Sequence, residues 1–91
     1  MTNKTYWHDF LNNLNALENT TEIEQFFEMV LTPSEREKIA ARYQILAELV
    51  GNKRTQRDIA ATLGVSIFNV TRGANQLKII DSKIKALIGK K

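Results

Sequence analysis

Residues 55–73 are Thr55-Gln-Arg-Asp-Ile-Ala-Ala-Thr-Leu-Gly-Val-Ser-Ile-Phe-Asn-Val-Thr-Arg-Gly73, and they contain the start signals of two short helices. Thr55 followed three residues later by Asp58 is typical of a helix N-cap, and Ser66 can cap a second helix. Gly64 can end the first helix, because glycine adopts the left-handed conformation of a helix C-cap without steric cost. The pattern therefore predicts helices over about residues 56–63 and 67–78, joined as a helix-turn-helix.

The apolar residues of this segment fit two helices that pack against each other. Ile59 and Leu63 lie on the inner face of the first helix, and the small Ala60 permits close approach. Val65 fills the junction, and Val70 packs the second helix against the first. In many DNA-binding proteins the second helix of such a pair lies in the major groove, but glycine-linked helix pairs are also common packing units without that role.

Upstream of this pair, the sequence predicts two amphipathic helices. The first covers about residues 4–18, and its apolar positions recur at steps of three and four: Trp7, Phe10, Leu11, Leu14 and Leu17. Thr21 with Glu24 predicts a capping box that opens the second helix after a break at Asn19 and Thr20. The inner face of the second helix is formed by Ile23, Phe26, Phe27 and Val30.

A long helix is predicted from Thr32-Pro33-Ser34-Glu35, which combines a hydroxyl cap, a proline at the first helical position and a glutamate at the third. Gly51 and Asn52 are suitable stops for it. A last short helix begins at Asp81 or Ser82. Because strand-like alternation is absent from the sequence, the predicted fold is all-α with six helices.

Length and composition limit the architecture and the chemistry. With 91 residues the chain is predicted to form one domain over residues 1–91, and six short helices bury too little surface for a stable monomer, so we expect a homodimer. The aromatic residues at helical spacing fit the core or a subunit interface, but they could instead line a ligand pocket: Trp7, Phe10, Phe26, Phe27 and Tyr43. Without cysteine, and with His8 as the only histidine, the sequence predicts no metal site.

The same limits apply to location and to catalysis. No run of 18 apolar residues is present, and the first residues lack the layout of a signal peptide, so we expect a cytoplasmic protein without membrane contact. His8 has no identifiable catalytic partner, and neither a nucleophile–base spacing nor a phosphate-binding loop is present. The sequence therefore does not predict an enzyme.

Charge is distributed unevenly along the chain. Residues 1–50 carry 4 basic and 8 acidic side chains, net −4, whereas residues 51–91 carry 9 basic and 2 acidic side chains, net +7. A small basic module most often meets a polyanion, and nucleic acid is the commonest one. The basic half contains the helix pair, which favours a DNA-binding function.

Three faces result when the second helix of the pair is unrolled at 100° per residue. Val70, Ala74 and Leu77 form the packed face, and an outward face that could enter the major groove carries Ile67, Phe68, Thr71, Asn75 and Lys78. A third face carries Asn69, Arg72, Gly73 and Gln76. Glycine inside a helix costs about 1 kcal/mol relative to alanine, so Gly73 indicates either close helix packing or a ligand that approaches the backbone.

Three segments resemble the tryptophan repressor family in order and spacing. They are Leu31-Thr-Pro-Ser-Glu-Arg-Glu37, Thr55-Gln-Arg-Asp58 and Thr71-Arg-Gly-Ala-Asn75, and the resemblance covers nearly the whole chain. It implies a six-helix intertwined homodimer, with dimerisation helices at about residues 4–51 and 81–89 and the helix-turn-helix at about residues 56–78. It also implies a transcriptional repressor that binds double-stranded operator DNA of tryptophan biosynthesis or uptake genes.

The resemblance further implies L-tryptophan as a corepressor, bound between the start of the long helix in one subunit and the recognition helix of the other. Arg42 matches the residue that stacks on the indole, Arg72 the one that holds the carboxylate, and Gly73 the glycine under the indole. Backbone carbonyls near the ammonium match Met29, Leu31 and Thr32. On this face Asn69 replaces a usual threonine and Gln76 replaces a small serine; the longer Gln76 could accept from the ammonium or fill part of the cavity.

On the DNA side, the resemblance carries over the contacts of Gln56, Arg57, Ile67, Thr71, Asn75 and Lys78. Phe68 stands where the family often has alanine, and Ala60 where it often has lysine, so operator preference is expected to differ. Two other functions remain open. One is a constitutive DNA-binding protein in which Gln76 occupies the ligand cavity, and the other is a protein-interaction adaptor that uses Ile67 and Phe68.

Overall fold

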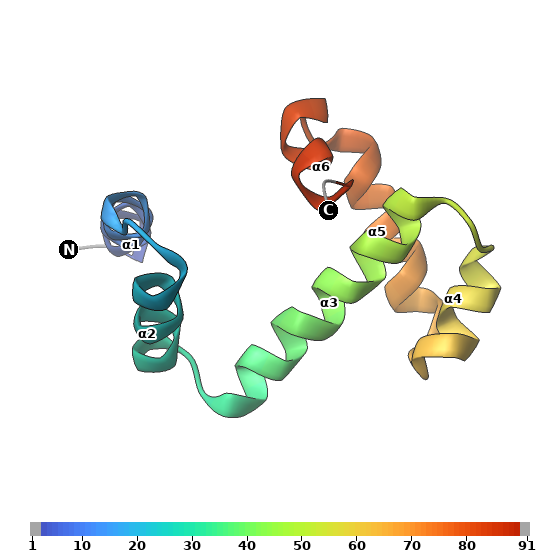
Figure 1. Ribbon diagram of the computed structural model, residues 1–91, viewed down its shortest axis with the longest axis horizontal. Coiled ribbons are helices and arrows are strands. Elements are labelled where there is room, and N and C mark those ends of the chain that lie inside the picture. Colours follow the sequence, from blue (N-terminus) through green and yellow to red (C-terminus); the bar gives the residue numbers. More distant parts are fainter. Residues whose placement is uncertain (1–2, 90–91) are drawn as a thin grey trace. The chain divides into compact units, whose positions relative to one another are not determined.

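The computed structural model describes residues 3–89, and within this range it contains six α-helices and no strand (Figure 1). The helices are α1 (Asn3–Ala16), α2 (Thr20–Val30), α3 (Pro33–Gly51), α4 (Gln56–Leu63), α5 (Ile67–Ile79) and α6 (Ser82–Gly89). The all-α, six-helix prediction is therefore confirmed. Between Glu37 and Lys38 the chain divides into two compact units, here called the N-terminal and C-terminal units.

Aromatic rings join α1 to α2 within the N-terminal unit. Trp7 stacks on Phe10 with ring centroids 5.3 Å apart, and Phe10 in turn lies 5.5 Å from Phe26 and 6.3 Å from Phe27. Such offset and edge-on pairs add to the hydrophobic contribution of their burial. Neither helix contains a buried residue, and Trp7 remains 58% exposed, so the unit keeps a large uncovered apolar surface.

The start of α2 differs from the sequence-based prediction. The capping box expected from Thr21 and Glu24 is wrong: the N-cap is Asn19, whose side-chain oxygen accepts the Glu22 amide at 2.9 Å. The Glu22 carboxylate completes the arrangement by accepting the Glu18 amide at 2.8 Å. Asparagine caps helices at least as well as threonine, and Asn19 with Glu22 has the same spacing two residues earlier.

The start of α3 agrees with its sequence signal. The Thr32 hydroxyl accepts the Glu35 amide at 3.2 Å, and the Glu35 carboxylate accepts the Thr32 amide at 2.9 Å, so the capping box is confirmed. At the other end, Gly51 is the last helical residue, and Asn52 takes the left-handed conformation with φ of 53°. Asparagine tolerates this conformation better than most residues, which explains the stop.

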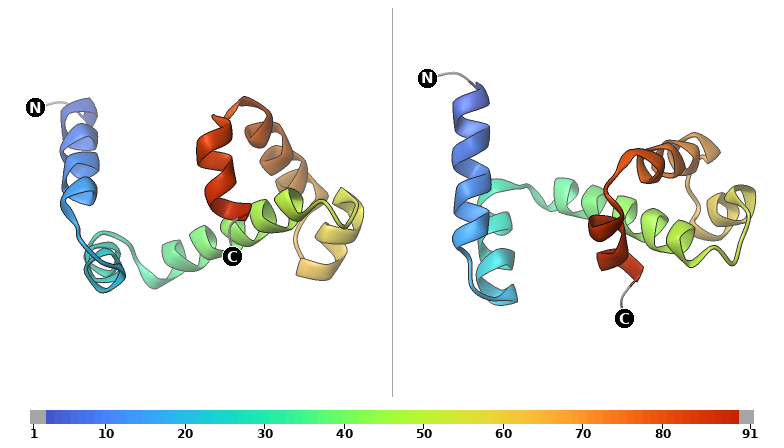
Figure 2. Two further views of the ribbon diagram at one scale, coloured as in Figure 1. Left: turned by 45° about the horizontal axis from the view of Figure 1, so that its top comes forward. Right: turned by 90° about the horizontal axis from the view of Figure 1, so that it is seen from above.

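The core of the C-terminal unit lies where α3, α4 and α5 meet. Its buried members are Ile45, Ile59, Ala60 and Val70, with Leu49, Leu63 and Val65 packed against them. The predicted caps of the helix pair are present, since Thr55 accepts the Asp58 amide at 3.1 Å and Ser66 accepts the Asn69 amide at 3.2 Å. Figure 2 shows α4, α5 and α6 gathered around the C-terminal half of α3. These contacts fix the orientation of α5 within this unit.

Gly51 and Gly64 both follow or end a helix, but they differ in backbone conformation. A Cβ added to Gly51 or Gly64 would meet no atom within 4 Å, but only Gly64 has a positive φ, of 67°. We expect Gly64→Ala to destabilise the protein by about 1 kcal/mol, because alanine strains the left-handed cap, whereas Gly51→Ala should cost nothing. Urea unfolding of both variants at one protein concentration measures the difference. Equal stability of the two variants would contradict the expectation.

Candidate functional site

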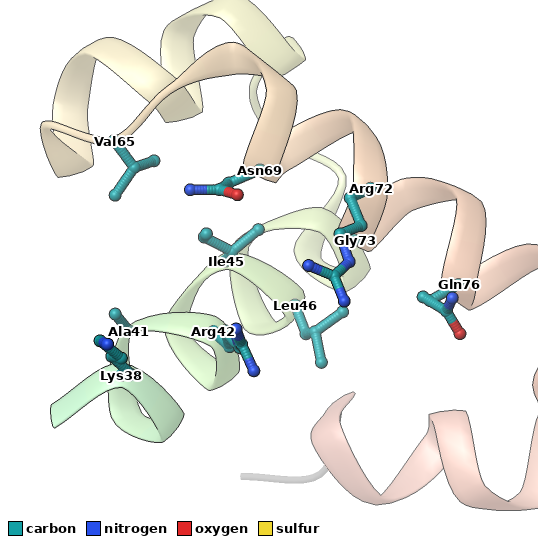
Figure 3. A pocket seen from close by; sticks show the side chains of 10 residues that line it. All are labelled: Lys38, Ala41, Arg42, Ile45, Leu46, Val65, Asn69, Arg72, Gly73 and Gln76. Carbon is teal, nitrogen blue, oxygen red and sulfur yellow. The ribbon is translucent and has the colours of Figure 1, made fainter. Parts of the chain in front are cut away.

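A cavity of about 440 Å³ lies between α3 and α5 in the C-terminal unit (Figure 3). Its volume falls in the range typical of small-molecule sites. Side chains from α3, from the turn before α5 and from α5 itself line it: Lys38, Ala41, Arg42, Ile45, Leu46, Val65, Asn69, Arg72, Gly73 and Gln76. The cavity therefore joins the third face of α5 to the middle of α3 of the same chain, whereas the resemblance implied a ligand between the long helix of one subunit and the recognition helix of the other.

Close packing of α5 on α3 explains Gly73. A Cβ at this position would lie 3.2 Å from the Leu49 Cδ1 atom and 3.3 Å from the Ile45 Cγ2 atom, tighter than ordinary van der Waals contact. Ile45 is 4% exposed and belongs to the core, while it also lines the cavity. Close packing, one of the two explanations that the sequence left open, therefore accounts for Gly73, and the residue also borders the cavity.

The charged residues that line the cavity are all cationic. Lys38 and Arg42 lie one turn apart on α3, and Arg72 extends from α5 toward α3 (Figure 3). Aspartate and glutamate are absent from the lining. In residues 3–89 the ion pair that the structure shows joins Arg54 to Glu48 at 3.8 Å, so the three lining cations are without an ion-pair partner there. This arrangement suits an anionic group, and a guanidinium can bind a carboxylate through two parallel hydrogen bonds.

Five of the predicted ligand residues meet at this cavity: Arg42, Asn69, Arg72, Gly73 and Gln76. The other three, Met29, Leu31 and Thr32, belong to the N-terminal unit and are absent from the cavity lining. The sequence argument missed the contribution of Lys38 and the apolar floor of Ile45 and Leu46. Helical spacing could have indicated Lys38, which precedes Arg42 by four residues and shares its face of the helix.

The predicted DNA-facing residues are all exposed. They are Gln56 and Arg57 at the start of α4, and Ile67, Phe68, Thr71, Asn75 and Lys78 on α5. Phe68 is 71% exposed and Ile67 48% exposed, although both are apolar. On the opposite side of α5, Val70 is fully buried while Ala74 and Leu77 are half-buried, which confirms the predicted packed face.

A hydrogen bond connects two of these exposed residues across the helix pair. The Thr71 hydroxyl on α5 donates to Oε1 of Gln56 at the start of α4, over 2.9 Å. Fifteen residues separate the two positions in sequence. Sequence reasoning placed both side chains at the DNA surface but gave no sign that they bind each other.

The described part of the chain offers neither a metal site nor a membrane-spanning helix. Residues 3–89 contain no group of three or more histidine, aspartate or glutamate side chains placed to hold a metal ion. None of the helices in this range is long and apolar enough to cross a membrane. The cavity between α3 and α5 and the exposed face of α5 contain residues that the sequence predicts to bind a ligand and DNA.

Comparison with known proteins assigns the chain to one family. The family model described as Trp repressor protein matches residues 5–91. A Trp operon repressor homolog from Chlamydia caviae is 41% identical over 86 residues, which cover 94% of this chain and 85% of the relative. Homologs of the same name from Actinobacillus succinogenes (33% over 86 residues, 94% and 85%) and Photobacterium profundum (41% over 76 residues, 81% and 72%) also match. The chain belongs to the Trp repressor family.

Proposed function

We propose that the protein is a homodimeric transcriptional repressor, activated by L-tryptophan, which binds operator DNA of tryptophan biosynthesis or uptake genes through α4 and α5. Family membership supports the repression of tryptophan genes, and the family is regulatory rather than enzymatic. Activation by tryptophan is supported by the cavity between α3 and α5. This cavity has an apolar floor and three lining cations without an ion-pair partner in residues 3–89.

Tryptophan fits the chemistry of this cavity group by group. Arg72 offers a guanidinium to the carboxylate, and Arg42 offers a flat face to the indole. Ile45 and Leu46 give the ring an apolar floor. The side-chain oxygen of Gln76 can accept a hydrogen bond from the ammonium. No acidic residue lines the cavity, so the ammonium needs further acceptors, and we assign this role to backbone carbonyls of Met29, Leu31 and Thr32 from a second subunit.

Uncovered apolar surface supports the homodimer. None of α1, α2 and α6 contains a buried residue. Their large apolar side chains that remain more than one-third exposed are Tyr6, Trp7, Leu11, Ile23, Met29, Val30, Ile84 and Leu87. Surface of this extent on a small protein is typical of an interface. We therefore assign dimerisation to residues 4–51 and 81–89 and DNA binding to residues 56–78 of a single domain.

The cavity lies where a ligand can influence DNA binding. Its walls belong to α3 and α5, and the exposed face of α5 carries the DNA-facing residues. A ligand held between Arg42 and Arg72 would favour one orientation of α5 relative to α3. Because the coupling between two binding equilibria is reciprocal, DNA must then raise the affinity for tryptophan by the same factor.

The proposal is tested by fluorescence anisotropy of a labelled palindromic operator-like duplex, titrated with protein at one fixed salt concentration. We expect L-tryptophan to tighten binding at least about fivefold, since allosteric coupling is typically about 1–3 kcal/mol, whereas L-alanine should have no effect. Equal binding with and without tryptophan would contradict the corepressor role and favour a constitutive DNA-binding protein.

A protein-interaction adaptor is the second candidate, because Phe68 and Ile67 are exposed on the same helix. The same titration repeated at several salt concentrations separates it from the first. Phosphate contacts release counterions, so binding to DNA through Arg57 and Lys78 should weaken steeply as salt is raised. Weak binding with little salt dependence would favour the adaptor.

A further inference from the structure

The hydrogen bond between Thr71 and Gln56 determines what each side chain can offer outside the protein. Thr71 donates its only hydroxyl hydrogen to Oε1 of Gln56 over 2.9 Å. Toward solvent, the threonine keeps only its acceptor lone pairs and its methyl group. It therefore has no side-chain donor left for the phosphate oxygens of DNA, which only accept hydrogen bonds.

Gln56 is affected in the opposite sense. With its Oε1 atom bound to Thr71, the side chain is held in one orientation, and its Nε2 group keeps two N–H donors. Both residues are exposed, so these donors are available to a partner. A glutamine that recognises adenine in the major groove also needs its oxygen as an acceptor, and here Thr71 occupies one of the two lone pairs of that oxygen and fixes its direction. An acceptor-only partner suits this geometry better.

The surroundings of Gln56 favour a negatively charged acceptor. Gln56 is the first residue of α4, and the Thr55 cap binds the amide of Asp58, so the helix itself leaves the amides of Gln56 and Arg57 unbonded. The partial positive charge of a helix N-terminus favours anions. The Arg57 side chain adds a full positive charge next to Gln56.

We propose that Thr71 is a positioning residue, which orients the Gln56 side chain so that its Nε2 group donates to a phosphate oxygen of the DNA backbone. This inference rests on the proposed DNA-binding function. Because the hydrogen bond joins α4 to α5, it also fixes the distance between a phosphate contact on one helix and the groove-facing residues on the other. The contact is independent of base sequence, so its loss weakens binding to all duplexes alike.

The test uses the full-length protein with Thr71→Val, Thr71→Ser, Gln56→Ala and the double variant Thr71→Val/Gln56→Ala. Each is titrated with a duplex selected by the wild-type protein, and with copies in which single phosphates are replaced in turn by neutral methylphosphonates. For the wild type we expect about a tenfold loss at one phosphate in each half-site, the size of one hydrogen bond to a charged group. The methylphosphonate at that position should not change the DNA affinity of Thr71→Val or Gln56→Ala. Thr71→Ser, which keeps the hydroxyl, should lose as much affinity there as the wild type does.

The double variant distinguishes positioning from an independent contact. If Thr71 acts through Gln56, the double variant binds no more weakly than Gln56→Ala alone. The side-chain NH₂ resonances of Gln56, recorded without DNA, should also shift in Thr71→Val and be restored in Thr71→Ser. Two results would overturn the inference while leaving the proposed function intact. One is a fold-loss of DNA affinity in the double variant equal to the product of the two single losses. The other is a loss of affinity by Thr71→Val, on methylphosphonate substitution at the same phosphate, as large as that of the wild type. A wild-type protein that binds no duplex would overturn both.

Discussion

Arg72→Ala is expected to abolish the response of operator binding to tryptophan. Arg72 lines the cavity on α5, and its guanidinium is the group to which we assign the ligand carboxylate. Removing two charge-assisted hydrogen bonds should weaken tryptophan binding roughly 100-fold, as expected for about 2.7 kcal/mol. Since the ligand and DNA equilibria are linked, the tryptophan-induced gain in DNA affinity should disappear at ligand concentrations that saturate the wild type.

Calorimetric titration measures the affinity for tryptophan, and fluorescence anisotropy with the duplex measures the gain in DNA affinity that tryptophan induces. Arg54→Ala is the matched control, because it removes the same charge from a side chain that is half-exposed, pairs with Glu48 and does not line the cavity. It should change tryptophan affinity less than twofold. Arg72→Lys keeps the charge without the bidentate geometry and should fall between the two. Tryptophan-dependent DNA binding by Arg72→Ala would refute the assignment of the carboxylate.

The fold was predictable from the sequence where the signals are local. The caps at Thr32, Thr55 and Ser66 each depend on a side chain and an amide three residues away, and all three are present. The packed face of α5 follows from helical periodicity alone, with Val70 at its centre. These features are specified within a few residues, so no knowledge of the tertiary structure was required.

Prediction failed where two local signals competed or where distant segments meet. Near α2, Asn19 with Glu22 and Thr21 with Glu24 have the same spacing, and the structure uses the first pair. The cavity floor could not be assigned, because Ile45 approaches Gly73 only when α5 packs on α3. A bond such as that between Thr71 and Gln56 likewise depends on the angle between two helices, which periodicity does not give.

Ile59→Ala is expected to have the largest effect on stability. Ile59 is fully buried in the core that joins α3, α4 and α5, together with Val70, which is equally buried. Truncation to alanine removes buried methyl and methylene groups and leaves a cavity, at a cost of about 2–5 kcal/mol. A loss of this size is a large fraction of the total stability of a small domain.

Ile67→Ala is the matched control, because it makes the same chemical change at a residue that is 48% exposed in the same helix pair. Its cost in unfolding free energy should stay within about 0.5 kcal/mol, while its DNA affinity should fall if Ile67 faces the major groove as we propose. Urea unfolding at one protein concentration measures the first quantity, since the stability of a dimer depends on concentration. If Ile59→Ala unfolded at the same midpoint as Ile67→Ala, the core of Ile45, Ile59 and Val70 would not be what holds α5 in place, and the link proposed between the cavity and the DNA surface would lose its structural basis.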